Sequence, residues 1–236
     1  MTHPLSADGD GVRWYSRDHE AVQLAAGLRS ARVTLLSGPA RSGKTTLLHQ
    51  GLLPLLRRRT VDHGPLPAAA LPPGVLPIPD RRRRATAPWA ATPEVAMVFD
   101  RWDGEPLAAL LGHVQAELGL RRVVDGLDDG ALGDSLALWG RQLGARLLLI
   151  LDGFDAVLGA PAGDGGCERL SAALLQAIGM PSLPANFLFA FRDTAEPGLM
   201  RWCRRWPGIE RQHVRLPPPQ GGGLLSSFAA ARTVAR

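Results

Sequence analysis

The segment from Gly38 to Thr45 has the residue types and spacing of a phosphate-binding loop. Its sequence, Gly-Pro-Ala-Arg-Ser-Gly-Lys-Thr, fits the pattern G-x-x-x-x-G-K-[ST]. Gly38 and Gly43 let the backbone wrap closely, so that its N–H groups turn toward phosphate. Lys44 can reach the outer phosphates of a nucleotide, and the Thr45 hydroxyl can ligate Mg²⁺. The residues expected to contact the ligand are Gly38, Pro39, Ala40, Arg41, Ser42, Gly43, Lys44, Thr45 and Thr46.

Lys44 is the single lysine among the 27 basic residues of the chain. A chain that otherwise uses arginine keeps a lysine at the position where a bulkier, planar guanidinium would not substitute. The alternative interpretation, a glycine turn before an ordinary helix, leaves this choice unexplained.

A second group of charged residues follows two apolar runs. Asp152 ends the run Leu147 to Leu151 and is expected to hold Mg²⁺ through water, as a second metal residue beside Thr45. Asp155 is expected to orient the attacking water or to assist the metal. Arg192 ends the next apolar run and is expected to contact the terminal phosphate of the ligand. The alternatives are a solvated Asp-Gly turn and an arginine that only faces solvent.

Hydrophobic periodicity predicts the elements that position these residues. Short apolar runs with β-branched or aromatic members alternate with stretches in which apolar residues recur at helical spacing. This alternation predicts a parallel sheet with helices on both faces. The predicted strands are 33–36, 96–99, 147–151, 187–191 and 214–216, and the predicted helices are 14–28, 44–56, 107–118, 132–143 and 167–178.

Three stretches do not fit this alternation. Residues 61–95 contain eight prolines, which remove backbone donors and disfavour helix, so we expect an irregular insertion. Residues 1–12 and 220–236 are expected to be flexible tails. The predicted domain therefore runs from residue 13 to residue 219.

Composition narrows the class of protein. The net charge is +5, but the tracts Arg57 to Arg59 and Arg81 to Arg84 supply seven positive charges, so nucleic acid is an unlikely partner. Cys167 and Cys203, the only cysteines, exclude a disulfide framework and are expected to be packing residues. No apolar run approaches the ~20 residues of a membrane span, and no secretory signal is visible, so we expect a cytoplasmic protein.

Assembled, these motifs resemble the STAND class of signal-transduction P-loop ATPases, and most closely the bacterial novel STAND modules. Ser37 to Leu56 is similar to the family's loop and helix, and Leu151 to Asp155 to its Walker B segment. Phe189 to Asp193 resembles its sensor-1 strand, and Val214 to Pro218 the strand that leaves the core. Trp14 to Glu20 resembles the segment that lies along the adenine, which implies a base contact for Arg17.

The resemblance implies a three-layer α/β/α sandwich with a five-stranded, mainly parallel sheet in the order 2-3-4-1-5, here without lid and winged-helix modules. It also implies an ATP/ADP switch with Mg²⁺, whose output is self-association or contact with partner proteins. Gly153 stands where many P-loop relatives carry a glutamate base, so hydrolysis is expected to be slow. The catalytic set is then Lys44, Asp152, Asp155 and Arg192.

Two other functions stay open at this point. A nucleic-acid-dependent P-loop ATPase would use the tract Arg81 to Arg84 as its contact, and its activity would fall steeply with salt. A non-enzymatic interaction module would keep the fold and bind ATP and ADP equally, or neither, because equal affinity for two states shifts nothing.

Overall fold

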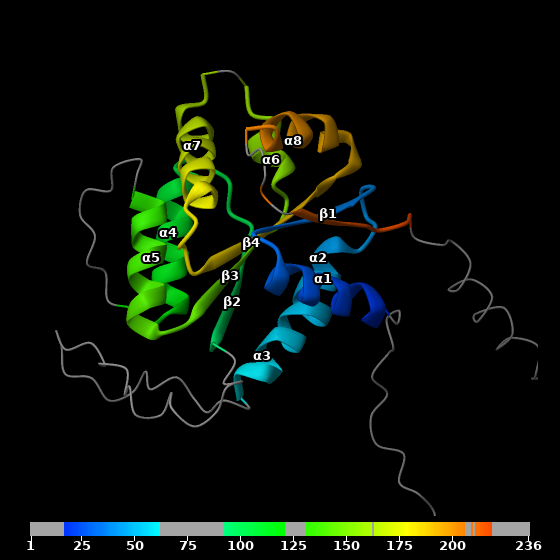
Figure 1. Ribbon diagram of the computed structural model, residues 1–236. Coiled ribbons are helices and arrows are strands. Elements are labelled where there is room, and N and C mark those ends of the chain that lie inside the picture. Colours follow the sequence, from blue (N-terminus) through cyan, green and yellow to red (C-terminus); the bar gives the residue numbers. More distant parts are fainter. Residues whose placement is uncertain are drawn as a thin grey trace, which may run out of the picture.

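The computed structural model describes residues 17–61, 92–120, 131–161, 163–205, 209 and 211–218. Five strands alternate with helices along the chain, as the sequence predicts (Figure 1). The strands are β1 (Val33–Gly38), β2 (Glu94–Phe99), β3 (Arg146–Leu151), β4 (Ala185–Arg192) and β5 (Arg211–Arg215). The helices are α1 (Asp18–Ser30), α2 (Lys44–Thr46), η1 (Leu47–Leu52), α3 (Leu53–Val61), α4 (Pro106–Glu117), α5 (Ala131–Leu143), α6 (Asp155–Leu158), α7 (Gly165–Gly179), η3 (Asp193–Ala195) and α8 (Glu196–Cys203).

The strands form one sheet in the order β2-β3-β4-β1-β5, and every neighbouring pair is parallel. This confirms the predicted order and the predicted α/β class. Because the strands are parallel, their carboxyl ends meet at one edge of the sheet. In register, Gly38 at the end of β1 lies beside Arg192 at the end of β4, and Phe99 lies beside Leu151. The residues that end the central strands are therefore brought together at this edge.

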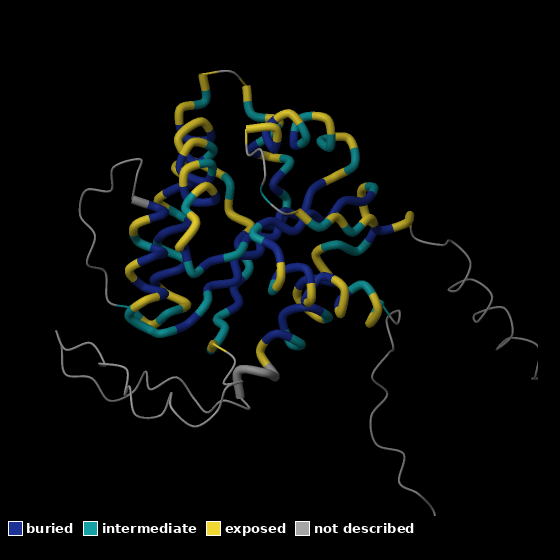
Figure 2. Tube along the Cα trace, in the orientation of Figure 1, coloured by how far each residue is buried: buried dark blue, intermediate teal, exposed yellow. Residues whose placement is uncertain are grey.

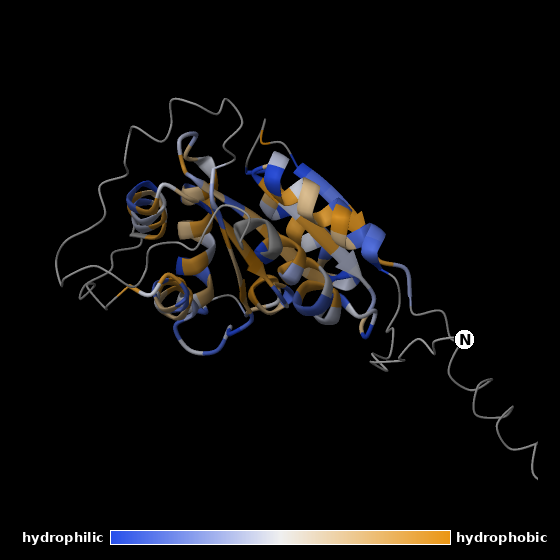
Figure 3. Cartoon of the chain, turned by 90° about the horizontal axis from the view of Figure 1, so that it is seen from below, coloured by the Kyte–Doolittle hydropathy of each residue, from blue (hydrophilic) through white to orange (hydrophobic). Residues whose placement is uncertain are grey.

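Helices cover both faces of the sheet, which gives the predicted three layers (Figure 1). On one face, α1 and the helix that follows β1 pack leucines against Leu148 and Ile150 of β3. On the other face, α4, α5, α7 and α8 pack against Leu147, Leu149 and Leu151 of the same strand. β1, β3 and β4 are mostly buried (Figure 2), and the strands with the most hydrophobic residues lie between the two helix layers (Figure 3). Successive side chains of a strand point to opposite faces of the sheet. Because helices cover both faces here, the central strands are apolar at nearly every position.

The helix after β1 is continuous from Lys44 to Val61, but it is not a plain α-helix. Its middle part, η1, is π-helical, and the Leu53 N–H donates to the Leu48 carbonyl five residues earlier. Pro54 follows directly, and a proline in a helix can make no hydrogen bond to the carbonyl four residues before it. The wider π-helical turn accommodates this gap, which the apolar spacing of residues 44–56 did not predict.

Element boundaries differ from the predictions mainly at the ends. The first helix begins at Asp18, β5 begins at Arg211 rather than near residue 214, and α8 was not among the predicted helices. β2 begins at Glu94, inside the stretch 61–95 that was expected to be irregular. The expected tails 1–12 and 220–236, and residues 62–91 of the expected insertion, lie outside the described residues.

Both cysteines are buried and free, as expected of packing residues. Trp202 is buried and packs its ring against Phe154 and Phe189. Within the described ranges, no helix has both the length and the apolar character needed to cross a membrane.

Candidate functional site

The loop between β1 and α2 has the tight backbone that its glycines predict. Gly43 has a φ of 82°, a left-handed conformation that glycine adopts freely. A β-carbon at Gly38 would lie 2.9 Å from Ser42 Oγ and 3.1 Å from the Leu216 carbonyl oxygen, so only glycine fits. Arg41 also has a positive φ, 61°, which costs an L-residue about 1–2 kcal/mol. Ala40, within the loop, and Thr46, just after it, are both exposed.

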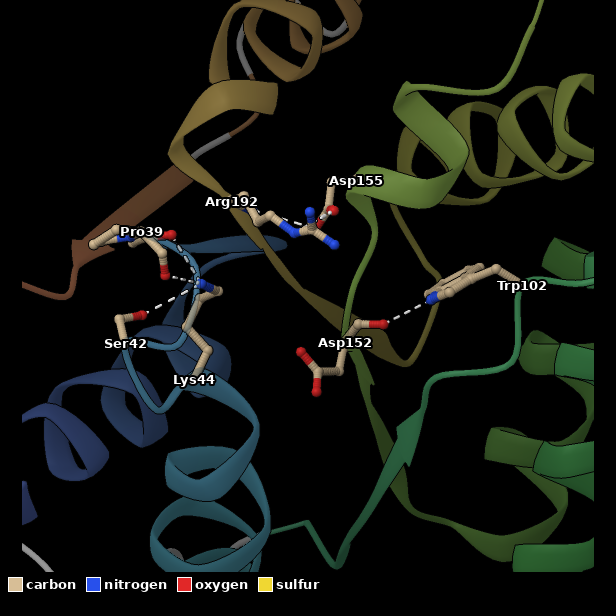
Figure 4. A network of polar contacts seen from close by, with 8 residues as sticks. Pro39, Ser42, Lys44, Trp102, Asp152, Asp155 and Arg192 are labelled. Carbon is tan, nitrogen blue, oxygen red and sulfur yellow. Dashed lines mark hydrogen bonds and ion pairs between the residues drawn. The ribbon is translucent and has the colours of Figure 1, made fainter. Parts of the chain in front are cut away.

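Lys44 lies across the mouth of its own loop (Figure 4). Its Nζ donates to the Gly38 carbonyl at 2.8 Å, to the Pro39 carbonyl at 2.9 Å and to Ser42 Oγ at 3.3 Å. Burial lowers the pKa of Lys44, and the carboxylates of Asp155, Asp152 and Asp193 oppose that shift. The loop thus holds a half-buried cation, and phosphate oxygens can replace the acceptors that now surround it.

Thr45 and Asp152 meet at the carboxyl edge of the sheet. Thr45 Oγ1 donates to Asp152 Oδ2 at 2.6 Å, and Asp152 is only 6% exposed. A hydroxyl beside a buried carboxylate fits Mg²⁺, which prefers hard oxygen ligands and retains several waters. No cluster of three or more His, Cys, Asp or Glu side chains suited to a metal occurs within the described part of the chain.

Asp155 and Arg192 form a two-point contact next to this pair. Arg192 Nε lies 3.1 Å from Asp155 Oδ2, and the Arg192 backbone N–H donates to Asp155 Oδ1 at 3.3 Å (Figure 4). The Arg192 side chain is 61% exposed, whereas that of Asp155 is 18% exposed. Strand register places Arg192 beside Gly38, so its guanidinium belongs to the same sheet edge as the phosphate loop.

The turn that carries Asp152 and Asp155 is held from behind by aromatic side chains. Trp102 Nε1 donates to the Asp152 carbonyl at 2.7 Å (Figure 4), and the Phe154 N–H donates to the Ala190 carbonyl at 2.9 Å. The Phe154 ring packs edge-on against Trp102, with centroids 5.7 Å apart. Sequence reasoning gave Trp102 no role, because only its position just after the second strand could have pointed to it.

Asp193 is an acidic residue near Lys44 for which the sequence predicted no role. It directly follows Arg192 and acts electrostatically on Lys44 and His213. Its Oδ1 is buried and makes no hydrogen bond with the described residues. It ends the motif Phe189 to Asp193, in which the sequence assigns a role only to Arg192. Asp193 therefore adds a third carboxylate to the surroundings of Lys44.

Arg17 lies immediately before α1, and its carbonyl accepts the Ala21 N–H at 3.0 Å. Its Nη1 is buried and has no hydrogen-bond partner among the described residues. α1 packs on the helix that follows the phosphate loop, where a β-carbon on Gly51 would lie 3.4 Å from Ala21 Cβ. The base contact expected for Arg17 stays a prediction.

Comparison with known proteins finds likeness only among solved structures, since no protein-family model and no curated protein matches the chain. The ORC2 protein of Aeropyrum pernix, in ADPNP–ADP complexes, matches with a TM-score of 0.54 and 16% identity, over 84% of this chain and 47% of that one. The ADP form of ORC2 gives 0.53 and 16%, over 85% and 47%. The Aeropyrum pernix ORC1 protein in complex with DNA gives 0.54 and 17%, over 92% and 50%.

The chain spans about half the length of these two proteins. At such low identity the likeness concerns the fold. The parallel sheet order, the glycine-containing loop between β1 and α2, and the match to ORC2 all indicate the same fold. The chain therefore has the fold of the P-loop ATPases.

Proposed function

We propose that the chain is an ATP-binding P-loop ATPase domain that hydrolyses ATP slowly and acts as a nucleotide-dependent regulatory switch of the STAND type. The observation that carries the proposal is the convergence of Lys44, the Thr45–Asp152 pair and the Asp155–Arg192 pair at one sheet edge. The ADPNP and ADP in the ORC2 neighbour support nucleotide as the ligand. The STAND assignment rests on the sequence resemblance.

Each of these groups has a distinct part in binding. The loop backbone from Gly38 to Gly43 presents N–H groups to phosphate, and Lys44 exchanges its carbonyl partners for phosphate oxygens. Thr45 and Asp152 would hold Mg²⁺, which neutralises charge on the outer phosphates when bound. Arg192 would contact the terminal phosphate, and Asp155, which pairs with Arg192 in the structure, would accept a proton from a nearby water.

Slow turnover follows from the surroundings of Asp155, the candidate base. Gly153 directly follows Asp152 and offers no side chain, and its φ of 71° suits glycine. Asp155 is the remaining candidate, but both of its oxygens contact Arg192. A water molecule must therefore compete with Arg192 for these oxygens. We therefore expect binding to be more evident than hydrolysis.

The switch follows from the same ion pair. ATP can draw Arg192 away from Asp155, whereas ADP lacks the phosphate that would do so. A ligand shifts a conformational equilibrium only through different affinities for its two states. We therefore expect different affinities for ATP and ADP, with self-association or partner binding as the output.

Calorimetric titration with ATP and with ADP, each with Mg²⁺, tests this proposal. Lys44→Ala should lower both affinities by about 100-fold or more, because charge-assisted contacts to phosphate are lost. Arg57→Ala is the matched control, since Arg57 is an exposed cation on α3, 3.7 Å from Glu117. Normal binding by Lys44→Ala, or no binding by the folded wild type, would contradict the proposal. The second result would favour the interaction module.

Nucleic acid is the second candidate partner, because the ORC1 neighbour was solved with DNA. Duplex DNA added to an ATPase assay discriminates between the two functions. Under the switch proposal the rate stays unchanged. A rise in rate that disappears at higher salt would favour the nucleic-acid-dependent ATPase instead.

A further inference from the structure

Arg41 has a backbone conformation that its own side chain disfavours. It is the one non-glycine residue with a positive φ in the part of the chain that the structure describes. Two residues later, Gly43 meets the same requirement without strain. The loop needs the left-handed turn to aim its N–H groups, but it does not need a β-carbon there. Glycine would give the same shape, so the shape of the loop does not by itself account for an arginine at this position.

The guanidinium of Arg41 also lacks the partners that occupy the other cations of the site. Lys44 donates three hydrogen bonds within the loop, and Arg192 is paired with Asp155. Arg41 is exposed and makes no hydrogen bond or ion pair with another described residue. An arginine fork matches the oxygens of a phosphate group, with which it forms two parallel hydrogen bonds.

The balance of charge at the site favours a third cation. Lys44 and Arg192 face three carboxylates, those of Asp152, Asp155 and Asp193. A nucleoside triphosphate brings further negative charge to the same place, and a diphosphate brings less. An additional cation on the loop compensates the triphosphate more than the diphosphate, because Coulomb energy grows with the charge it meets.

We propose that Arg41 contacts the outer phosphates of the bound nucleotide and favours the triphosphate over the diphosphate. This inference rests on the proposed function and names a specificity-determining residue for it. The strained backbone and the unpartnered guanidinium then have one explanation. The loop accepts a less stable empty state because the side chain binds the ligand.

Three substitutions separate charge from strain. R41K keeps the charge, R41N removes the charge at a residue that tolerates the left-handed region, and R41G removes both charge and strain. Each is titrated with ATP and with ADP in the presence of Mg²⁺, and each is unfolded thermally without nucleotide. R41N and R41G should lose about tenfold in ATP affinity and about twofold or less in ADP affinity. R41K should keep the preference for ATP, and R41G should raise the Tm by about 2–4 °C.

Two results would overturn the inference: wild-type ATP affinity in R41N and R41G, or equal losses for ATP and ADP. The second would mean that the side chain shapes the loop and does not read the phosphates. Failure of the proposed function has a different signature, because Lys44→Ala would then leave both affinities unchanged. If Lys44→Ala weakens binding and R41N does not, only the role of Arg41 is refuted.

Discussion

The two sides of the site are held in place by different means. The loop side, residues 38–46, is shaped by its backbone and lies where the leucine-rich helices cover the sheet. The carboxylate side, residues 152–155 with Arg192, is positioned by side chains that pack behind it. Phe154 is fully buried and contacts the rings of Trp102, Phe189 and Trp202. One side therefore depends on local conformation, and the other depends on packing between distant segments.

The two sides should therefore tolerate different kinds of substitution. On the loop side, a substitution matters when it changes a φ angle or a charge at the loop itself. On the carboxylate side, a change in the aromatic core moves Asp152 and Asp155 without touching either residue. Metal binding and phosphate sensing should therefore be more sensitive to remote core substitutions than phosphate binding is.

The largest expected effect comes from removing the ring at the centre of the aromatic packing. Phe154→Ala should lower the free energy of unfolding by about 3–5 kcal/mol, because it leaves a cavity behind the turn. Leu48→Ala on the leucine face is the control, with an expected loss of about 2–5 kcal/mol. Urea unfolding measures both, and ATP titration in the cold measures binding. The comparison fails if Mg²⁺-dependent binding weakens more in Leu48→Ala than in Phe154→Ala.

A smaller effect is expected from neutralising the buried carboxylate. Asp152→Asn keeps an oxygen that can accept the Thr45 hydroxyl, but it removes the charge that would hold the metal. ATP affinity should fall about tenfold with Mg²⁺, or ~1.4 kcal/mol, and should stay the same in excess chelator. An equal loss with and without Mg²⁺ would mean that Asp152 acts on the loop and not on the metal.

Trp102→Phe tests the hydrogen bond behind the carboxylate turn. It keeps an aromatic ring against Phe154 and removes the donor to the Asp152 carbonyl. The free energy of unfolding should fall by about 1 kcal/mol. The Mg²⁺ concentration needed for half-maximal ATP binding should rise, which a purely structural role would not require. Trp139→Phe, at a buried tryptophan on α5, provides the matched control.

The smallest effect concerns pH and arises next to the loop side, where His213 of β5 contacts Ser37 of β1 with 2.9 Å between Nε2 and Oγ. Burial lowers the pKa of His213 and Arg215 lowers it further, against the opposing effects of Glu196 and Asp193. The unfolded chain, with a histidine pKa near 6.5, then binds the proton more readily than the folded chain. The contribution of His213 to stability is therefore complete above about pH 6.5 and is lost as the pH falls below that value.

His213→Gln removes this titration and keeps a side-chain donor for Ser37. From about pH 7.5 to about pH 5.5, the Tm should fall more in the wild type than in His213→Gln. Parallel curves for the two proteins would show that another group accounts for the acid sensitivity.

The sequence predicts the loop side better than the carboxylate side. Gly38, Lys44 and Thr45 are fixed by spacing within one short segment, and the apolar runs predict the sheet. The contact between Trp102 and Asp152 joins residues 50 positions apart, and no local pattern reports it. β5 was only partly predicted because its exposed and half-buried residues alternate, which leaves no apolar run. The strain at Arg41 is also invisible in the motif, which allows any residue there.

Leu216 links the far end of the domain to the loop side. Its N–H donates to the Ser37 carbonyl at 2.8 Å, and its own carbonyl leaves no room for a side chain on Gly38. A tilt of the backbone after β5 would therefore press on the first residue of the phosphate loop before it reached any other strand. A force transmitted along the backbone that follows Leu216 would therefore act on the phosphate loop directly, without first deforming the core.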